Sequence, residues 1–320
     1  MDGFASAFVF KKYLAPLLKI EVSEIIGLNP YDLTMGKFRF EKGDIVLDLP
    51  QPKEKVFFWC DHHLSAKPVE ELPENYHWKE VPSCAGLLVD IAVKKGLKAG
   101  RELLDFKEAL DIMDGAMYTK EQIKKVYYHQ KNYDSISMLE KVHIISSMFH
   151  TGDSFLNWEI FSSLLSKSPQ DLPQTPVEGD VWNLQPFIFF TAQLKGYEEW
   201  RKNIDKIIYM DEKSKCVVLD VRKEFIRGRK DRFYPCIRFE DSSYNLSLKQ
   251  VGKEIYVGIG SNIFHKERCK VNIGKLCEIV GTKFGEGVGG GHYAVGGATI
   301  DARKGDDALK FILERLMEKN

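Results

Sequence analysis

Residues 56–63, Val-Phe-Phe-Trp-Cys-Asp-His-His, join five apolar residues directly to one acid and two imidazoles. The apolar part is typical of a buried strand, so the polar triplet would lie at the carboxyl end of that strand. A carboxylate beside two imidazoles is a natural site for a divalent metal ion and a phosphate. Taken alone, the triplet is equally consistent with a polar strand end that carries one buried, hydrogen-bonded histidine.

A second motif, Gly289-Gly290-Gly291-His292, combines three residues that lack side chains with one titratable group. Such a backbone lets main-chain N–H groups approach an anion closely, although a glycine run is more often a simple turn. The two motifs together, in this order and at this separation, favour a metal-dependent phosphoesterase.

The first half of the chain alternates between strand and helix patterns. Short apolar strands are expected at residues 44–49 and 56–60, and helices at 5–18, 84–95 and 106–117. This alternation of strands and helices predicts a parallel sheet covered by helices. Ligands bind such sheets at the carboxyl ends of the strands, where Asp48 and Asp61-His62-His63 would lie.

The second half changes character after a proline-containing break at 166–180, which predicts a surface loop. An amphipathic connecting helix is expected over 187–210. It is followed by strands at 216–221, 236–239 and 254–259 and by a final helix at 306–319. The sequence therefore predicts an α/β protein with a catalytic domain (1–185), a connecting helix (186–212) and a smaller C-terminal domain with a mixed sheet (213–320).

Composition limits the function classes. The 320 residues suit two domains, and 46 basic residues balance 46 acidic ones, which argues against a protein that coats long nucleic acid. The six cysteines form no C-x-x-C pair, as expected of reduced thiols in a cytosolic protein. No apolar stretch reaches membrane-spanning length and the N-terminus lacks a signal-peptide pattern, so we expect a cytoplasmic protein without membrane partners.

On its two motifs the chain resembles the DHH phosphoesterase superfamily, in particular the branch that joins a DHH domain to a C-terminal DHH-associated domain ending in GGGH. The branch includes nanoRNases, pAp phosphatases, RecJ-like exonucleases, cyclic-dinucleotide phosphodiesterases and exopolyphosphatase-like proteins. The resemblance covers nearly the whole chain. It implies an active site in the cleft between the domains and two metal ions, usually manganese, with magnesium or cobalt as substitutes.

The resemblance implies metal ligands at Asp2, Asp48, His62 and Asp114. Asp48 matches the second of the family's metal-binding motifs and would be a bridging or near-bridging ligand. Asp114 fits the fourth motif because small residues and a tyrosine follow it. Asp111 is the competitor, since an i,i+3 spacing puts both acids on one helical face.

Two further residues of the DHH string would act without being the principal ligands. The resemblance implies that His63 faces the substrate phosphate. Asp61 is then expected to orient a histidine, which is a common role for a carboxylate beside a metal site.

The chain departs from the family at the first of the family's metal-binding motifs. Residues 2–7, Asp-Gly-Phe-Ala-Ser-Ala, resemble the end of H-x-D-x-D-G-x-x-S-A, whose histidine and first aspartate would fall before Met1. Either the start was placed too late and Asp2 is a genuine ligand, which we favour, or one metal site is impaired. Weakened metal binding and low activity are expected of the chain as it stands.

Substrate contacts are expected in the C-terminal half. The resemblance implies a substrate-binding loop at Gly289, Gly290, Gly291 and His292. Relatives often carry a phosphate-gripping arginine where this chain has residues 260–262, Gly-Ser-Asn, and Arg268 is the nearby candidate. The basic run at 222–232 is either a solvated hairpin or a rim that guides phosphates.

The leading hypothesis is a manganese-dependent hydrolase that uses a metal-bound hydroxide on phosphodiester or phosphomonoester bonds. Its substrates would be short single-stranded RNA or DNA, or small nucleotides. One alternative is a polyphosphate or pyrophosphate hydrolase, and another is a non-catalytic nucleotide-binding protein. No protein partner is implied, although a homodimer would be compatible.

Overall fold

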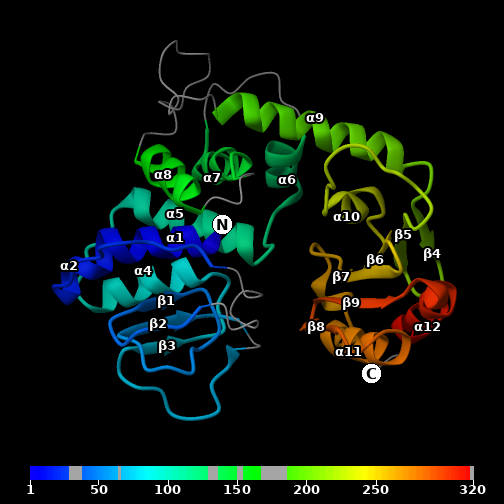
Figure 1. Ribbon diagram of the computed structural model, residues 1–320. Coiled ribbons are helices and arrows are strands. Elements are labelled where there is room, and N and C mark those ends of the chain that lie inside the picture. The colour runs from blue at the N-terminus through cyan, green and yellow to red at the C-terminus, as the bar shows by residue number, and fades with distance from the viewer. Residues whose placement is uncertain (29–37, 64–65, 129–135, 150–153, 167–185, 318–320) are drawn as a thin grey trace. The chain divides into compact units, whose positions relative to one another are not determined.

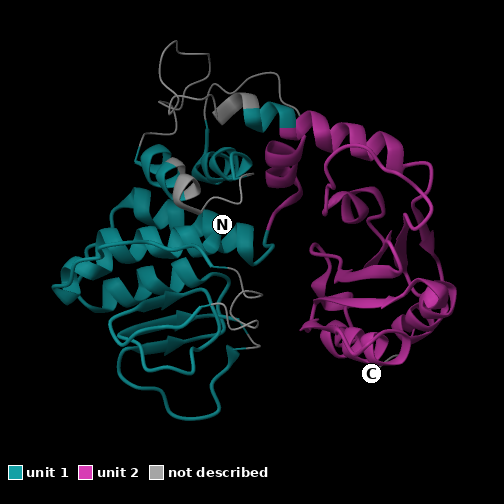
Figure 2. Cartoon of the chain, in the orientation of Figure 1, with its two compact units in different colours: residues 1–117, 130–192 teal, residues 118–129, 193–320 magenta. Residues whose placement is uncertain are grey.

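The computed structural model describes residues 1–28, 38–63, 66–128, 136–149, 154–166 and 186–317 (Figure 1). The chain groups into two compact units, residues 1–117 with 130–192, and residues 118–129 with 193–320 (Figure 2). Each unit has its own sheet, parallel in the first and mixed in the second, which confirms the predicted α/β class. The domain boundaries expected from the sequence remain a prediction, and the expected loop at 166–180 lies almost entirely outside the described residues.

The first unit is built on a parallel three-stranded sheet. Its strands are β1 (Ile45–Leu47), β2 (Phe58–Asp61) and β3 (Tyr76–Trp78), in that order across the sheet. Because side chains alternate along β2, Trp59 packs with Val46 and Tyr76 on one face, while the Phe58 ring meets Phe10 on the other, 4.9 Å between ring centroids. All four residues of β2 are buried, as the apolar run before the DHH triplet predicts.

Helices cover this sheet. The first unit contains α1 (Asp2–Val9), a π-helical turn (Phe10–Leu14), α2 (Ala15–Leu18), α4 (Cys84–Lys94), α5 (Arg101–Asp114), α7 (Met138–Ser147) and α8 (Ser154–Leu165). The Ser83 hydroxyl caps α4 by accepting from the Gly86 amide, and Ser137 caps α7 together with Glu140. No helix in the described part of the chain is long and apolar enough to cross a bilayer.

The second unit is built on a six-stranded sheet in the order β4-β5-β6-β7-β9-β8. The strands are β4 (Tyr209–Asp211), β5 (Cys216–Asp220), β6 (Tyr244–Val251), β7 (Glu254–Ser261), β8 (Gly289–His292) and β9 (Val295–Asp301), and β5 runs parallel to β6. The helices are α6 (Lys120–Tyr127), α9 (Pro186–Ile204, whose first residues belong to the first unit), α10 (Tyr234–Arg238), α11 (Ile273–Phe284) and α12 (Gly305–Met317), with short 3₁₀ turns at Lys266–Arg268 and Ala302–Lys304. Residues of α11 and α12 form the main core with one face of the sheet.

Two local expectations for this unit are wrong. Residues 236–239 were expected as a strand, but 234–238 form the short helix α10, in which Pro235 occupies the first turn, where its missing N–H costs nothing. The glycine motif 289–292 was expected as a loop, but it is the edge strand β8. A two-residue connection, Tyr293-Ala294, joins it to β9 in a hairpin. Its conformation is therefore set by pairing with β9, which lies outside the motif.

Glycines let α11 pack directly against β8. A Cβ atom on Gly281 of the helix would lie 2.4 Å from the Val288 carbonyl oxygen, and one on Gly274 would lie 2.5 Å from the Gly291 carbonyl oxygen. From the strand side, a Cβ on Gly289 would lie 2.1 Å from the Cys277 carbonyl oxygen. Helix and strand backbones are therefore in contact, and part of the glycine motif serves this packing.

This contact predicts an inverted effect of alanine in a helix. Alanine normally stabilises a helix interior relative to glycine by about 1 kcal/mol, but Gly281→Ala should lower the free energy of unfolding by about 1–3 kcal/mol, because the new methyl group has no room. Urea denaturation followed by circular dichroism would measure the change. The exposed neighbouring substitution Thr282→Ala is the control and should stay within about 0.5 kcal/mol of the parent. A stabilised Gly281→Ala protein would contradict the packing described here.

Candidate metal centre

Four chain segments of the first unit bring acids and imidazoles to one point. The parallel pairing of Leu47 with Cys60 leaves Asp48 and Asp61 at the carboxyl ends of neighbouring strands. The start of α1 adds Asp2, and the end of α5 adds Asp114. The side chains form two groups that could each hold a metal ion, Asp48-Asp61-His62-His63 and Asp2-His62-Asp114.

His62 is the centre of this cluster. Its Nε2 lies 3.4 Å from Asp114 Oδ2, 3.5 Å from Asp48 Oδ1 and 3.6 Å from Asp2 Oδ2. Its Nδ1 lies 2.9 Å from the carbonyl oxygen of Val81, which can only accept a hydrogen bond. The proton is therefore held on Nδ1 in the neutral ring, and Nε2 presents a lone pair to the carboxylates. A lone pair surrounded by three carboxylates is a suitable ligand for a cation.

Several polar atoms of the cluster are buried without a hydrogen bond. Asp48 Oδ1, Asp61 Oδ2 and His62 Nε2 have no hydrogen-bond partner among the described residues. Burying such atoms unpaired is costly, so their concentration at one point calls for a ligand. Carboxylate oxygens with an imidazole nitrogen suit manganese or magnesium better than a thiolate site would. The residues present therefore fit a divalent metal ion.

The electrostatics indicate the same requirement. Burial, followed by repulsion from Asp48 and Asp114, raises the pKa of Asp2 to about 8. Burial also raises the pKa of Asp114, with a further contribution from Asp48. For His62, burial favours the neutral ring, but Asp48, the Val81 carbonyl and the other carboxylates outweigh it and raise the pKa to about 9. The cluster thus holds protons where a metal ion would supply the positive charge.

Asp61 organises the turn that carries both histidines. Its Oδ1 accepts hydrogen bonds from the amides of His62 (2.7 Å) and His63 (3.2 Å) and lies 2.8 Å from His63 Nδ1. The hydrogen bond between the His63 ring and the Asp61 carboxylate, which accepts it, is the main reason that the pKa of His63 is raised. The His63 side chain is 38% exposed, whereas Asp61 is fully buried. An accessible imidazole whose pKa is raised, which favours its protonated form, is well suited to contact an anionic substrate beside a metal site.

The backbone supports two of the acids. Both Asp2 oxygens accept hydrogen bonds from the first amides of α4, at 2.7 Å from Cys84 and 3.1 Å from Ala85. The positive end of α4 therefore anchors this carboxylate. Asp48 adopts a left-handed conformation with φ of 57°, and its amide donates to the Cys60 carbonyl, 2.9 Å away. Such a conformation is uncommon outside glycine and concentrates at functional sites.

The structure separates the two candidate acids of α5. Asp114 lies in the cluster, whereas Asp111 accepts from the Ser83 hydroxyl at 2.6 Å and pairs with Lys107 at 3.0 Å. A Cβ on Gly86 would lie 2.4 Å from Asp111 Oδ1, so this acid is packed against the start of α4. Asp111 is thus engaged in structural contacts, and Asp114 carries the geometry expected of a ligand.

No family model and no curated protein matches the sequence. Solved structures do match. The pGpG-specific phosphodiesterase PggH from Vibrio cholerae aligns with 98% of this chain and 95% of its own, at 19% identity and a TM-score of 0.69. The DHH domain of a member of the S1p family of ribosomal proteins aligns with 100% of this chain and 85% of its own, at 13% identity and a TM-score of 0.60. RecJ from Thermus thermophilus, solved with Mn²⁺, aligns with 98% of this chain and 50% of its own, at 14% identity and a TM-score of 0.56.

The chain shares the fold of these structures, one of which is a DHH domain. Within this DHH fold, the residues expected as ligands from the sequence, Asp2, Asp48, His62 and Asp114, come together in the first unit. The residues expected to contact substrate, Gly289, Gly290, Gly291, His292 and Arg268, belong to the second unit. The Arg268 guanidinium donates to the Glu240 carbonyl at 3.1 Å and lies 3.9 Å from Glu267, so its charge is partly engaged.

Sequence reasoning missed the groups that fix the candidate ligands in place. The Val81 carbonyl sets the His62 tautomer, and the amides of Cys84 and Ala85 hold Asp2. These are main-chain groups, so the residue types in the sequence do not reveal them. The one usable signal is Ser83, which predicts the start of a helix and hence amides with no partner in the helix itself.

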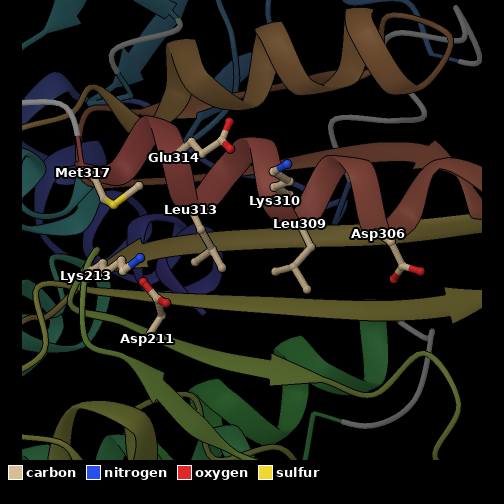
Figure 3. A pocket seen from close by; sticks show the side chains of 8 residues that line it. All are labelled: Asp211, Lys213, Asp306, Leu309, Lys310, Leu313, Glu314 and Met317. Atoms are coloured by element: carbon tan, nitrogen blue, oxygen red, sulfur yellow. The ribbon is translucent and has the colours of Figure 1, made fainter.

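Two cavities differ in chemistry. One of about 510 Å³ opens beside Asp48 and His63 and is otherwise lined by α1 and by residues 21–28 and 38–49 of the first unit. The other, about 310 Å³, lies in the second unit between α12 and β4, and Figure 3 shows the side chains that line it, which include Lys213, Lys310, Asp211 and Asp306. There Asp211 already accepts from the Ser214 amide and hydroxyl, and Asp306 pairs with Arg222. Of these two cavities, the first lies beside buried polar atoms that have no hydrogen-bond partner among the described residues.

The pKa shifts predict how pH affects the metal-free protein. Both His62 and Asp2 have a higher pKa in the folded chain than in the unfolded chain, so folding takes up protons. The resulting stabilisation is complete below pH 6.5 for His62 and is lost as the pH rises toward about 9. The melting temperature in EDTA should therefore fall across this window. His62→Gln should reduce the slope, and a melting temperature that stays level or rises would contradict the assigned electrostatics.

Proposed function

We propose that this protein is a metal-dependent phosphoesterase, using manganese, that hydrolyses phosphate ester bonds of short oligonucleotides or small nucleotides. The observation that carries the proposal is the cluster around His62. Asp48 Oδ1, Asp61 Oδ2 and His62 Nε2 are buried there with no hydrogen-bond partner among the described residues, and carboxylate oxygens of Asp2 and Asp114 lie within 3.6 Å of His62 Nε2. Divalent ions held there would activate a water molecule and neutralise charge on a phosphate. Asp2, Asp48, His62 and Asp114 would be the ligands.

The remaining residues of the DHH string take positioning and binding roles in this proposal. Asp61 holds the turn and the orientation of the His63 ring. His63 donates a hydrogen bond to a phosphate oxygen, and the raised pKa of its ring favours the protonated form that such a bond requires. In the second unit, the strand Gly289–His292 contributes to substrate binding.

Two structural neighbours support the substrate class and the metal. PggH is a pGpG-specific phosphodiesterase, which makes a very short nucleotide a reasonable substrate for a protein of the same fold and length. RecJ was solved with Mn²⁺. The donor set around His62 is compatible with that ion.

The proposal is tested by release of mononucleotide from a short end-labelled RNA, with and without manganese. We expect slow but manganese-dependent release, abolished in His62→Ala, with inorganic polyphosphate as a parallel substrate. Equal release by the parent and by His62→Ala would disprove the assigned site. Faster cleavage of polyphosphate than of RNA would replace the nucleotide substrate with the polyphosphate alternative.

A paired substitution on α5 tests the ligand assignment. Asp114→Asn should lower kcat by at least about 100-fold, because even partners one step beyond metal ligands account for 10–100-fold effects. The matched control Asp111→Asn should stay within about tenfold of the parent in kcat. It should instead lower the free energy of unfolding by about 1 kcal/mol, through its hydrogen bonds to Ser83 and Lys107. Steady-state kinetics and urea denaturation on both variants would measure these changes. A larger loss of kcat in Asp111→Asn than in Asp114→Asn would make Asp111 the ligand.

A further inference from the structure

Two tryptophans of the first unit donate their indole N–H groups to main-chain carbonyls beside the candidate metal centre. Trp59 Nε1 lies 2.9 Å from the carbonyl oxygen of Leu49, and Trp78 Nε1 lies 2.9 Å from the carbonyl oxygen of His63. Leu49 directly follows the candidate ligand Asp48, and His63 is the residue expected to contact phosphate. Each indole therefore reaches a turn that carries one of the side chains of the site.

The two contacts repeat one geometry in the parallel sheet (Figure 1). Trp59 on β2 reaches the turn after β1, and Trp78, the last residue of β3, reaches the turn after β2. Both rings belong to one apolar cluster, in which Trp59 is fully buried and Trp78 packs against it. Each contact thus runs from one strand to the turn at the carboxyl end of its neighbour, which is where ligands bind such sheets.

The bond from Trp59 helps to fix the strained turn at Asp48. The Asp48 amide donates to the Cys60 carbonyl, and the indole of Trp59 holds the carbonyl of the next residue, Leu49. A left-handed conformation such as that of Asp48 persists only where the surrounding structure over-determines it, and these two bonds act on either side of the Asp48 Cα atom. They thereby fix the direction of the Asp48 carboxylate, whose Oδ1 lies 3.5 Å from His62 Nε2.

The bond from Trp78 completes the support of the turn after β2. Asp61 Oδ1 holds the start of this turn by accepting hydrogen bonds from the amides of His62 and His63. The indole of Trp78 holds its far end at the His63 carbonyl. The main chain of His63 is therefore bonded at both its N–H and its C=O, which limits where its half-exposed ring can point.

The same apolar cluster contains a contrasting polar aromatic residue. The hydroxyl of Tyr76 on β3 accepts a hydrogen bond from the Val56 amide, 2.9 Å away, and Val56 precedes β2. This bond lies at the amino end of β2, away from the candidate metal centre. Packing alone requires only an apolar ring at positions 59 and 78, which phenylalanine would supply, whereas the two indole N–H groups add donors that reach the site.

We propose that Trp59 and Trp78 are positioning residues of the candidate metal centre. Trp59 places Asp48 to receive a metal ion, and Trp78 places the main chain of His63 so that its ring meets a substrate phosphate. Both act through main-chain carbonyls. The inference rests on the proposed function and deepens it, because it assigns separate supports to metal binding and to phosphate binding. The two roles can be measured separately, since Asp48 is a candidate ligand and His63 is assigned to the phosphate.

The test is isothermal titration of the full chain, first with Mn²⁺ and then, at saturating Mn²⁺, with inorganic phosphate. Trp59→Phe should weaken Mn²⁺ binding about 10- to 100-fold, the range found for groups that support metal ligands. Trp78→Phe should leave Mn²⁺ binding unchanged and weaken phosphate binding about tenfold, as expected for partial loss of one charge-assisted hydrogen bond. The matched control Tyr76→Phe removes a hydrogen bond from the same cluster and should change neither affinity.

A second variant at each position separates the N–H group from the packing. Phenylalanine is smaller than tryptophan and leaves space in the core, whereas benzothienylalanine keeps the shape of the indole and replaces its N–H with sulfur. Benzothienylalanine at position 59 or 78 should therefore reproduce the result of the corresponding phenylalanine variant. Urea denaturation of every variant would establish that it is folded.

Parent-like Mn²⁺ affinity in both variants at position 59 would overturn the role of Trp59, and parent-like phosphate affinity in both variants at position 78 would overturn that of Trp78. An equal loss of Mn²⁺ binding in all variants, Tyr76→Phe included, would reduce the contacts to general stability and overturn the inference. A parent chain that binds no Mn²⁺ would overturn it together with the metal centre.

The binding measurements also separate the inference from the proposed function. Manganese-dependent hydrolysis of RNA by the parent, combined with unaltered binding in the variants, would reject the positioning roles alone. Mn²⁺ binding that is weakened in Trp59→Phe, in a chain that cleaves no RNA, would support the role of Trp59 and reject the phosphoesterase.

Discussion

The parallel pairing of β1 with β2 is the constraint on which the first unit depends. It sets Leu47 opposite Cys60, and the amide of Asp48 donates to the Cys60 carbonyl, so both strands end at the same level. The acid that follows one strand and the acid and histidines that follow the other are thereby placed together. A slip of one residue would turn the buried Trp59 toward the opposite face and remove Asp48 from reach of His62. The candidate metal centre therefore depends on the register of these two strands.

The parts of this centre that follow from local pattern could be predicted from the sequence. An apolar run followed by Asp61-His62-His63 predicts a strand with polar groups at its end, and parallel topology then brings Asp48 close. The choice between Asp111 and Asp114 could not be made on spacing, because both lie on one helical face. It depends on Ser83 and Lys107, which reach Asp111 from other positions in the fold. Tertiary hydrogen bonds of this kind have no periodicity for a sequence to reveal.

The second unit shows a different limit of sequence reasoning. The glycine run was expected to be a substrate-binding loop because of its resemblance to the family motif, yet 289–292 is a strand whose partner, β9, lies just beyond the motif. The glycines of this strand also have separate roles. Gly289 allows the backbone of α11 to pack against the strand, while Gly290 lies opposite Gly297 of β9, which in turn lies opposite Gly258 of β7. A motif read as one functional element thus also serves helix packing and strand pairing.

The left-handed backbone at Asp48 has a consequence for how this protein could diverge. Aspartate, asparagine and glycine tolerate that conformation, whereas most residues meet a steric penalty there. A descendant that abandoned the metal chemistry proposed here would be free to lose the carboxylate but would still need the same turn at the end of β1. Its most accessible replacements are therefore asparagine and glycine. Either residue at this position in an otherwise intact fold would be the mark of a lineage that kept the architecture after the catalytic requirement had lapsed.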